Sequence, residues 1–237
     1  VFDVKGIVVG KFNQGFFLND GTGFIFIFTG SAPTVERGDV VRLTGVFDIY
    51  NDQPELKDIT NLNTIDDTFA LPSAVTKSLA DVVAFDPKDV SVYSIYLQLK
   101  GTVVTEQGSE RTEYYLVDED NNKVRIYYRS EINEVAPYVD KEVTINVFIY
   151  RYHNSDKVWE VIFSGGDRIE VDMTDAERIQ AIKDAIDALP KEVTTELVLP
   201  GKLFGVDVTW TSDNPAVIAI DPETGKVTIN QPEGSDE

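Results

Sequence analysis

The sequence has no cysteine and a single histidine, His153, among 237 residues. Disulfides, cysteine-ligated zinc sites, iron–sulfur clusters and cysteine nucleophiles are therefore excluded. A Ser–His–Asp site would have to use His153, which lies in the predicted turn 153–156, and no sequence motif marks a serine as its nucleophile. Because a histidine in a turn is usually solvated, we expect no catalytic residue and no enzymatic activity.

Positive charge is also scarce, with 21 Lys and Arg against 41 Asp and Glu and a net charge of −20. This balance argues against broad binding of nucleic acid, which depends on counterion release by cations. No apolar run reaches the roughly 18 residues that a membrane-spanning helix needs. The sequence contains no phosphate loop and no dinucleotide fingerprint, so no cofactor is expected.

An internal repeat organises most of the chain. The segment KGIVV (5–9) matches KGTVV (100–104), and residues 16–28 match 114–128. Residues 38–56 then match 140–158, and the offset between the copies grows only at turns. This pattern is typical of a duplicated fold whose insertions fall in loops.

Each copy is predicted to contain three strands, a crossover and a two-stranded hairpin. The tight turns use Gly, Asn and Asp, which tolerate the positive φ that such turns need. This order is that of the OB-fold, a five-stranded, partly open barrel. The predicted fold is therefore mainly β, with two five-stranded OB-like barrels, a helix and a partial Ig-like β-sandwich.

The first copy resembles the bacterial OB-fold domains attached to secreted nucleases and surface proteins. The resemblance rests on the DGTG hairpin (20–23), the GD before the fourth strand (38–39) and the Tyr-Asn turn (50–51). It covers about residues 1–66 and, more weakly, 95–169. It implies an accessory domain, and the family has no catalytic residues to transfer to this chain.

The C-terminal section has a different pattern. Apolar residues at 179, 182, 186 and 189 predict a helix, with Thr174 and Glu177 as its capping box and Pro190 at its end. Residues 172–230 resemble an atrophied bacterial Ig-like domain, and the sequence ends before its last expected strands, so we expect a truncated domain. Trp210 is expected in its core against Val206, Val208 or Ile218.

These patterns divide the chain into four parts. The section 170–237 carries 15 acidic and 5 basic residues, half of the net charge. A short helix within 76–83 is expected between the barrels. The predicted parts are a first barrel (1–66), a linker with a short helix (67–94), a second barrel (95–169) and a helix with a partial Ig-like domain (170–237).

One basic and aromatic cluster stands out as a candidate ligand-binding site. Cations beside aromatic rings are typical of single-strand nucleic-acid binding. The alternative is a solvated strand face whose cations pair with Glu119 or Glu131, and the acidity of this copy favours that alternative. The candidate residues are Lys123, Arg125, Tyr127, Arg129 and Arg151.

Two other segments allow more than one interpretation. Both faces of FIFIF (24–28) are apolar, so the face outside the barrel needs cover from a linker, a neighbouring domain or a ligand, and we favour cover within the chain. The hairpin 118–122 is rich in the oxygen ligands that Ca²⁺ prefers. It lacks the spacing and the glycine of a calcium loop, so an ordinary acidic turn is favoured and no metal is expected.

The sequence therefore predicts a non-catalytic binding or spacer region. We expect it to be a fragment of a larger bacterial protein that is secreted or displayed on the cell surface. The alternative is an accessory region of an extracellular nuclease that binds single-stranded nucleic acid. The partners considered are weakly bound single-stranded nucleic acid or carbohydrate, and adjacent domains of the same chain.

Overall fold

The computed structural model describes residues 1–237 except 131, 165–168, 172, 190–196, 223–224 and 230–237. The chain forms two compact units. The first contains Val1–Ile132 and Tyr138–Glu170, and the second contains Asn133–Pro137 and Val171–Glu237. The first unit holds the barrel strands of both repeat copies.

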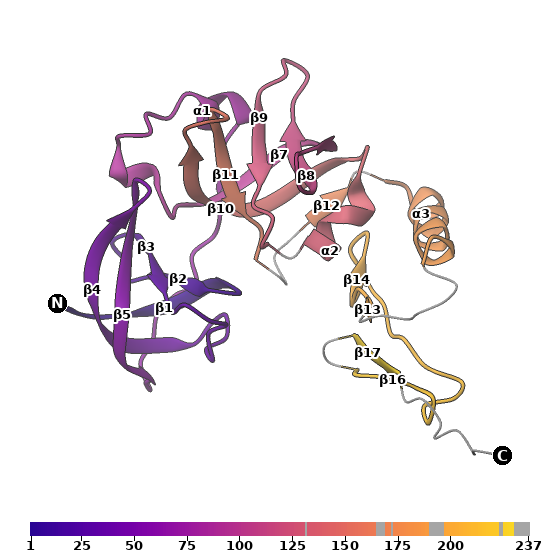
Figure 1. Cartoon of the computed structure of the whole chain (residues 1–237), viewed down its shortest axis with the longest axis horizontal. Helices are drawn as coiled ribbons and strands as arrows, with labels where there is room; N and C mark the ends of the chain where they lie inside the picture. The colour runs from indigo at the N-terminus through magenta and orange to yellow at the C-terminus, as the bar shows by residue number, and fades with distance from the viewer. Residues whose placement is uncertain (131, 165–168, 172, 190–196, 223–224, 230–237) are drawn as a thin grey trace. The chain divides into compact units, whose positions relative to one another are not determined.

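The first copy forms a closed five-stranded barrel with the strand order β1-β2-β3-β5-β4 (Figure 1). Strand β4 closes the ring against β1, and β3 meets β5 as a parallel pair. The inner faces are lined by aliphatic and aromatic residues such as Val8, Phe16 and Leu43. The strands are β1 (Phe2–Phe12), β2 (Gly15–Asn19), β3 (Phe24–Phe28), β4 (Val40–Tyr50) and β5 (Gln53–Thr64).

The second copy repeats this topology strand for strand. Its five central strands follow the order β10-β11-β9-β8-β7, β10 also pairs with β7, and the parallel pair is β9 with β11. The prediction of two barrels of the same design is confirmed. The strands are β7 (Tyr96–Gln107), β8 (Thr112–Val117), β9 (Lys123–Ile126), β10 (Glu142–His153) and β11 (Val158–Ile162).

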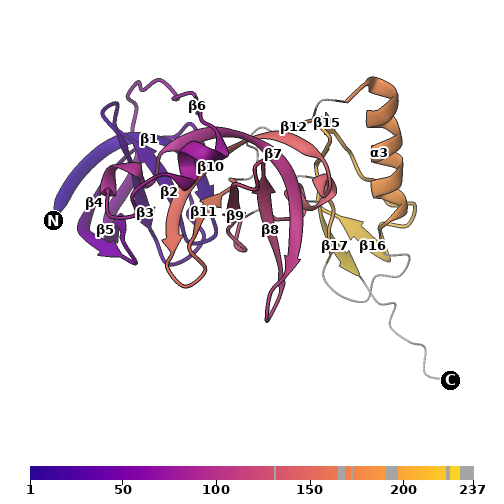
Figure 2. The same cartoon turned by 90° about the horizontal axis from the view of Figure 1, so that it is seen from above.

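Short elements connect and extend the barrels (Figure 2). The linker helix starts later than predicted because Ser78 is its N-cap and Thr76 belongs to a strand beside β7. Strand β12 extends the sheet beside β10. These elements are β6 (Val75–Thr76), α1 (Leu79–Val83), η1 (Val90–Val92), α2 (Ile132–Val135), η2 (Ala136–Tyr138) and β12 (Ile169–Val171).

The second unit contains the predicted helix, and the Thr174–Glu177 capping box forms as expected. Its strands are short and make a three-stranded sheet of order β13-β17-β16 and a β14–β15 hairpin. The elements are α3 (Asp175–Asp187), β13 (Leu197–Val198), β14 (Lys202–Leu203), β15 (Val206–Asp207), β16 (Ile218–Ile220) and β17 (Lys226–Ile229).

Trp210 does not occupy the position that the sequence predicted. It is only partly buried, and Val206 and Ile218, two of its expected neighbours, are exposed. Its indole nitrogen instead donates a hydrogen bond of 2.8 Å to the carbonyl oxygen of Pro200. The buried apolar residues in this part of the chain are Leu199, Leu203, Phe204 and Val227.

Candidate functional site

The two barrels share one aromatic core, which covers the outer face of β2 and β3. Phe17 and Phe26 pack against Phe148 and Tyr150 of β10. Phe24 and Phe28 lie partly buried at the edge of the same cluster. The expectation that the second face of FIFIF is covered from within the chain is therefore confirmed, and a ligand is not needed to cover it.

Polar contacts accompany this shared core. The Lys11 amide donates to Ser164 Oγ at 2.9 Å, and that hydroxyl donates back to the Lys11 carbonyl. Arg37 Nη2 donates to Tyr96 Oη at 3.1 Å. The β4–β5 and β10–β11 turns also meet, since Asn154 Nδ2 lies 3.4 Å from Asp52 Oδ2. The two barrels therefore form one packed body.

Arg125, the centre of the candidate site, is only 6% exposed. Its Nε and Nη2 reach Glu160 Oε1, the Nε at 2.8 Å, and its Nη1 donates to Asp156 Oδ2 at 2.6 Å. Arg151 donates to the other oxygen of Glu160. Burial opposes the charged form of Arg125, but Glu160 and Asp156 outweigh it, so the pKa of Arg125 lies above its usual value.

Tyr127 is also directed inward. It is 4% exposed and belongs to the shared core, where the Arg151 guanidinium lies 4.9 Å from its ring centre. Burial raises the pKa of the Tyr127 hydroxyl, and the neighbouring Tyr150 adds to this effect. The contacts within the protein therefore include those of Arg125, Tyr127 and Arg151. The expectation of an accessible strand face was wrong for Arg125 and Tyr127, because both are buried.

The two remaining candidates are more accessible. Lys123 pairs with Glu106 at 2.7 Å, and its ammonium lies 4.6 Å from the Tyr115 ring centre. Arg129 donates to the side-chain oxygen of Gln14 in the first barrel. The expected partners were Glu119 or Glu131. The structure gives Glu106 and Glu160 instead, while Glu131 lies outside the described residues. The ligand-binding role of the five residues stays a prediction.

A second basic and aromatic group, which the sequence pattern did not predict, lies beside these residues. The Arg111 guanidinium is stacked 3.7 Å from the Tyr128 ring centre, and that of Arg129 is 5.3 Å away. Tyr128 is partly exposed. The only sequence signal was the run Tyr127-Tyr128-Arg129, because Arg111 is distant in the chain and comes close only through the β7–β8 loop.

The acidic hairpin 118–122 is stabilised by hydrogen bonds within its own turn. Asp118 Oδ1 accepts hydrogen bonds from the amides of Asp120 and Asn122, at 3.0 and 2.8 Å. Among the residues that the structure describes, no three acidic or histidine side chains are grouped as a metal site. His153 Nδ1 lies 3.1 Å from Asp156 Oδ2, beside the Arg125 network.

One groove of about 310 Å³ lies in the first barrel, between the end of β3 and residues 57–62 of β5. It opens where β3 and β5 separate, since these strands pair only at Phe26 with Glu55 and at Ile27 with Leu56. The lining is mainly apolar, with Phe28, Ile59 and Leu62, and its cation, Lys57, already pairs with Asp48 at 2.6 Å.

No described helix is long and apolar enough to span a membrane. No family model matches the chain, and no curated protein matches it in sequence. Among solved structures, it is similar to a murine DNA-binding protein bound to double-stranded DNA, with a TM-score of 0.40 and 8% identity. That match covers 72% of this chain and 98% of the other.

Two further solved structures show a similar or lower degree of likeness. The Ifi202 HINa domain in complex with double-stranded DNA gives a TM-score of 0.38 at 6% identity, over 71% of this chain and 95% of that domain. A multidomain protein with nucleic-acid-binding domains from Streptococcus pneumoniae gives 0.23 at 11% identity. This third match covers 78% of this chain and 58% of the other.

Proposed function

We propose that the chain is a non-catalytic binding and spacer region of a larger bacterial protein, secreted or displayed on the cell surface. The observation that carries the proposal is the aromatic core shared by the barrels. Outer faces of strands two and three commonly bind ligands in OB-folds. Here that face of the first barrel holds the second barrel, so the pair serves as one stiff element.

The charged groups support the same function. The buried Arg125 pairs with Glu160 and Asp156, and the partly buried Arg151 pairs with Glu160, which matches a structural role. Buried charges are found in pairs because an isolated charge away from water is costly. The excess of acidic residues keeps such a region soluble and discourages non-specific contact with polyanions.

The stiffness of the pair can be tested by backbone ¹⁵N relaxation on the whole chain. We expect the amides of the two barrels to report one common rotational correlation time. Two different correlation times would mean that the barrels move independently and would contradict the spacer function. Fluorescence-anisotropy titrations with oligosaccharides at low and physiological salt then test whether the element also binds carbohydrate.

A second candidate is an accessory region of an extracellular nuclease that binds single-stranded nucleic acid. It is favoured by one observation, the accessible group formed by Arg111, Tyr128 and Arg129. We expect weak binding that is lost as salt rises, because the net charge of −20 repels a polyanion. Anisotropy titration with single-stranded DNA and RNA measures it. Binding that is tight and insensitive to salt would contradict this mode.

A further inference from the structure

Two guanidinium groups converge on one partly exposed phenol at the end of β9. Arg111 comes from the β7–β8 loop, which projects from the second barrel in Figure 2, and its side chain is 41% exposed. It lies flat against Tyr128, with 3.7 Å between the guanidinium carbon and the ring centre. Arg129 approaches the same ring at 5.3 Å.

Among the residues that the structure describes, the partners of these two arginines do not neutralise both positive charges. Arg111 Nε donates to Glu113 Oε1 at 3.0 Å, which occupies one edge of a guanidinium that has five N–H donors. Arg129 Nη1 donates to Gln14, whose amide is uncharged and does not neutralise the cation. This arrangement differs from the Arg125 site, where carboxylates face the guanidinium on both sides.

The pKa of the Tyr128 hydroxyl shows how the surrounding charges act at this position. Partial burial works to raise the pKa of Tyr128, but its hydrogen bond with Tyr127 and the two guanidiniums outweigh this, so the pKa is below its usual value. The group therefore already stabilises negative charge on an oxygen at this position. An anionic oxygen brought by a ligand would meet the same field.

We propose that Arg111, Arg129 and the Tyr128 hydroxyl form a binding site for a phosphate group. Guanidinium forks match phosphate oxygens in geometry, and the phenol adds a further donor. Arg111 covers a face of the Tyr128 ring, so the contact is with phosphate rather than with a stacked base. The inference deepens the second candidate function and rests on it only where the phosphate belongs to single-stranded nucleic acid.

The first experiment titrates the whole chain with inorganic phosphate and follows the ionisation of tyrosine by near-ultraviolet absorbance. We expect phosphate to move one phenol titration to higher pH, because a bound anion opposes the phenolate. Tyr128→Phe should remove this optical signal. Calorimetry should show phosphate binding about tenfold weaker in the Arg111→Gln/Arg129→Gln double variant.

Lys5→Gln is the matched control. Lys5 also lies over an aromatic ring, 5.6 Å from the Phe69 ring centre, but it is paired with Asp67 at 2.7 Å. This variant should bind phosphate as the unmodified chain does. Circular dichroism checks that each variant folds. A phosphate affinity that falls equally in Lys5→Gln and in the double variant would overturn the site, since general loss of charge would explain it.

A second arm replaces phosphate with a short single strand of thymidine nucleotides. Binding of both ligands, lost together in the double variant, supports the site and the nucleic-acid function. Binding of phosphate alone supports the site and removes the nucleic-acid function. DNA binding that survives in the double variant keeps the function and overturns the site, and the absence of any phosphate binding overturns the site outright.

Discussion

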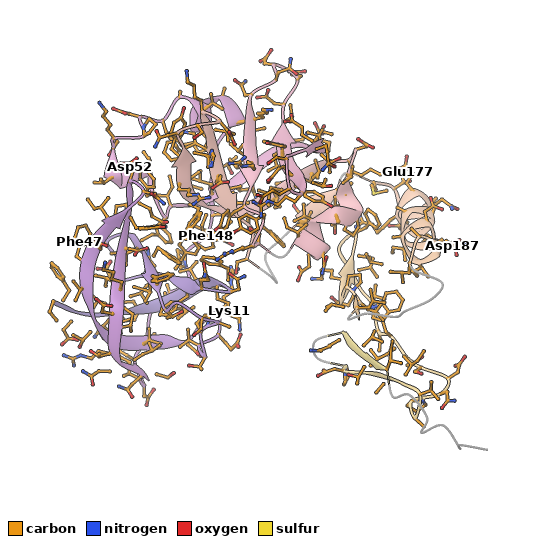
Figure 3. All side chains as sticks on the ribbon, in the orientation of Figure 1. Lys11, Phe47, Asp52, Phe148, Glu177 and Asp187 are labelled. Carbon is orange, nitrogen blue, oxygen red and sulfur yellow. The ribbon has the colours of Figure 1, made fainter. Side chains whose placement is uncertain are left out.

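Phe17 of the first barrel and Phe148 of the second stack face to face, with ring centres 4.0 Å apart and ring planes at 1° to each other. Tyr96 stacks on Phe148 at 4.5 Å. Figure 3 labels Phe148 where the barrels meet and Phe47 on the outward side of β4. Phe148 therefore lies at the centre of the core that the two repeats share, and this core packs the tandem as one unit.

Phe148→Ala should destabilise both barrels. The side chain is fully buried, so its removal leaves a cavity at the shared core, and we expect a loss of about 3–5 kcal/mol in the free energy of unfolding. Urea unfolding followed by circular dichroism measures it. Phe47→Ala is the control, since this ring is 45% exposed and should change stability by less than about 0.5 kcal/mol. Similar losses for the two variants would contradict the shared core.

Gly10→Ala should disturb the packing of Phe148 from the first barrel. A Cβ at this position would lie 2.6 Å from a carbon of the Phe148 ring and 3.0 Å from Ser164 Oγ. Overpacking of this kind costs about 1–3 kcal/mol. Gly23→Ala is a suitable control, because a Cβ there meets nothing within 4 Å.

A double-mutant cycle distinguishes a clash of the alanine methyl with the Phe148 ring from general strain at position 10. In a Phe148→Leu background the ring is gone, so Gly10→Ala should cost less than it does alone. Strictly additive effects would mean that the alanine methyl does not act through Phe148. The repeat adds a comparison, because the residue that corresponds to Gly10 in the second copy is Thr105, which is exposed.

The sequence carried the strand order and the repeat register because both depend on local patterns. Alternation, turn residues and the repeat together align Phe26 of the first copy with Arg125 of the second. The structure agrees, because Phe26 pairs with Glu55 of β5 and Arg125 pairs with Glu160 of β11. The full length of β5 is harder to predict, since the strand continues through Asp58 and Asn61, which adopt positive φ values of 51° and 54°. Irregular residues of this kind end a simple pattern without ending the strand.

The candidate site was harder to predict because it depends on contacts distant in sequence. Alternation assigns Arg125 to an outer face, but it does not reveal that Glu160 lies beside it across a parallel pair of strands. Tyr128 lies beyond the end of β9 at Ile126, so alternation does not predict where its side chain lies. The Arg111 contact needs the conformation of a loop, which composition does not specify.

Glu160→Gln should be far more damaging than loss of an exposed ion pair. It leaves the buried Arg125 with Asp156 as its remaining carboxylate partner and weakens the contact of Arg151, so we expect a loss of about 3–5 kcal/mol. Lys123→Gln breaks the exposed pair with Glu106 and should cost only about 0.2–1 kcal/mol. Chemical unfolding of both variants at one salt concentration compares them directly, and equal costs would contradict a structural role for the buried network.

Trp210→Phe tests how the C-terminal unit holds its indole. The change keeps an aromatic ring but removes the hydrogen bond to Pro200, so we expect a loss of about 0.5–1.5 kcal/mol. In a Trp159→Phe background, Trp210 is the only tryptophan, and acrylamide should quench its fluorescence to an intermediate degree. Complete protection from acrylamide would instead support the core position that the sequence suggested.

Glu55 should make the stability of the first unit depend on pH. It corresponds to Glu160 in the repeat, but Phe26 and Asp48 stand where the second barrel has Arg125 and Arg151. Glu55 is 5% exposed, and burial, with the nearby Asp48, raises the pKa of its carboxyl above 4.5, against the opposing effect of Lys57. The glutamate is therefore paired with two arginines in the second barrel, whereas in the first barrel it is buried beside Asp48.

The raised pKa fixes the direction of the effect. Folding favours the protonated form of Glu55, so this residue contributes stability below pH 4.5 that is lost as pH rises through the higher folded-state pKa. Glu55→Gln removes this contribution, and the variant should gain stability relative to the unmodified chain as pH rises from about 4 to 7. Urea midpoints of the variant and of the unmodified chain across this range measure the difference in stability between them. Asp3 and Asp67, whose pKa values are lowered by Arg42 and Lys5, have the opposite pH trend, but they are present in both proteins and cancel in the difference. A difference that does not change with pH, or that falls as pH rises, would show that Glu55 is not held in its protonated form by the fold.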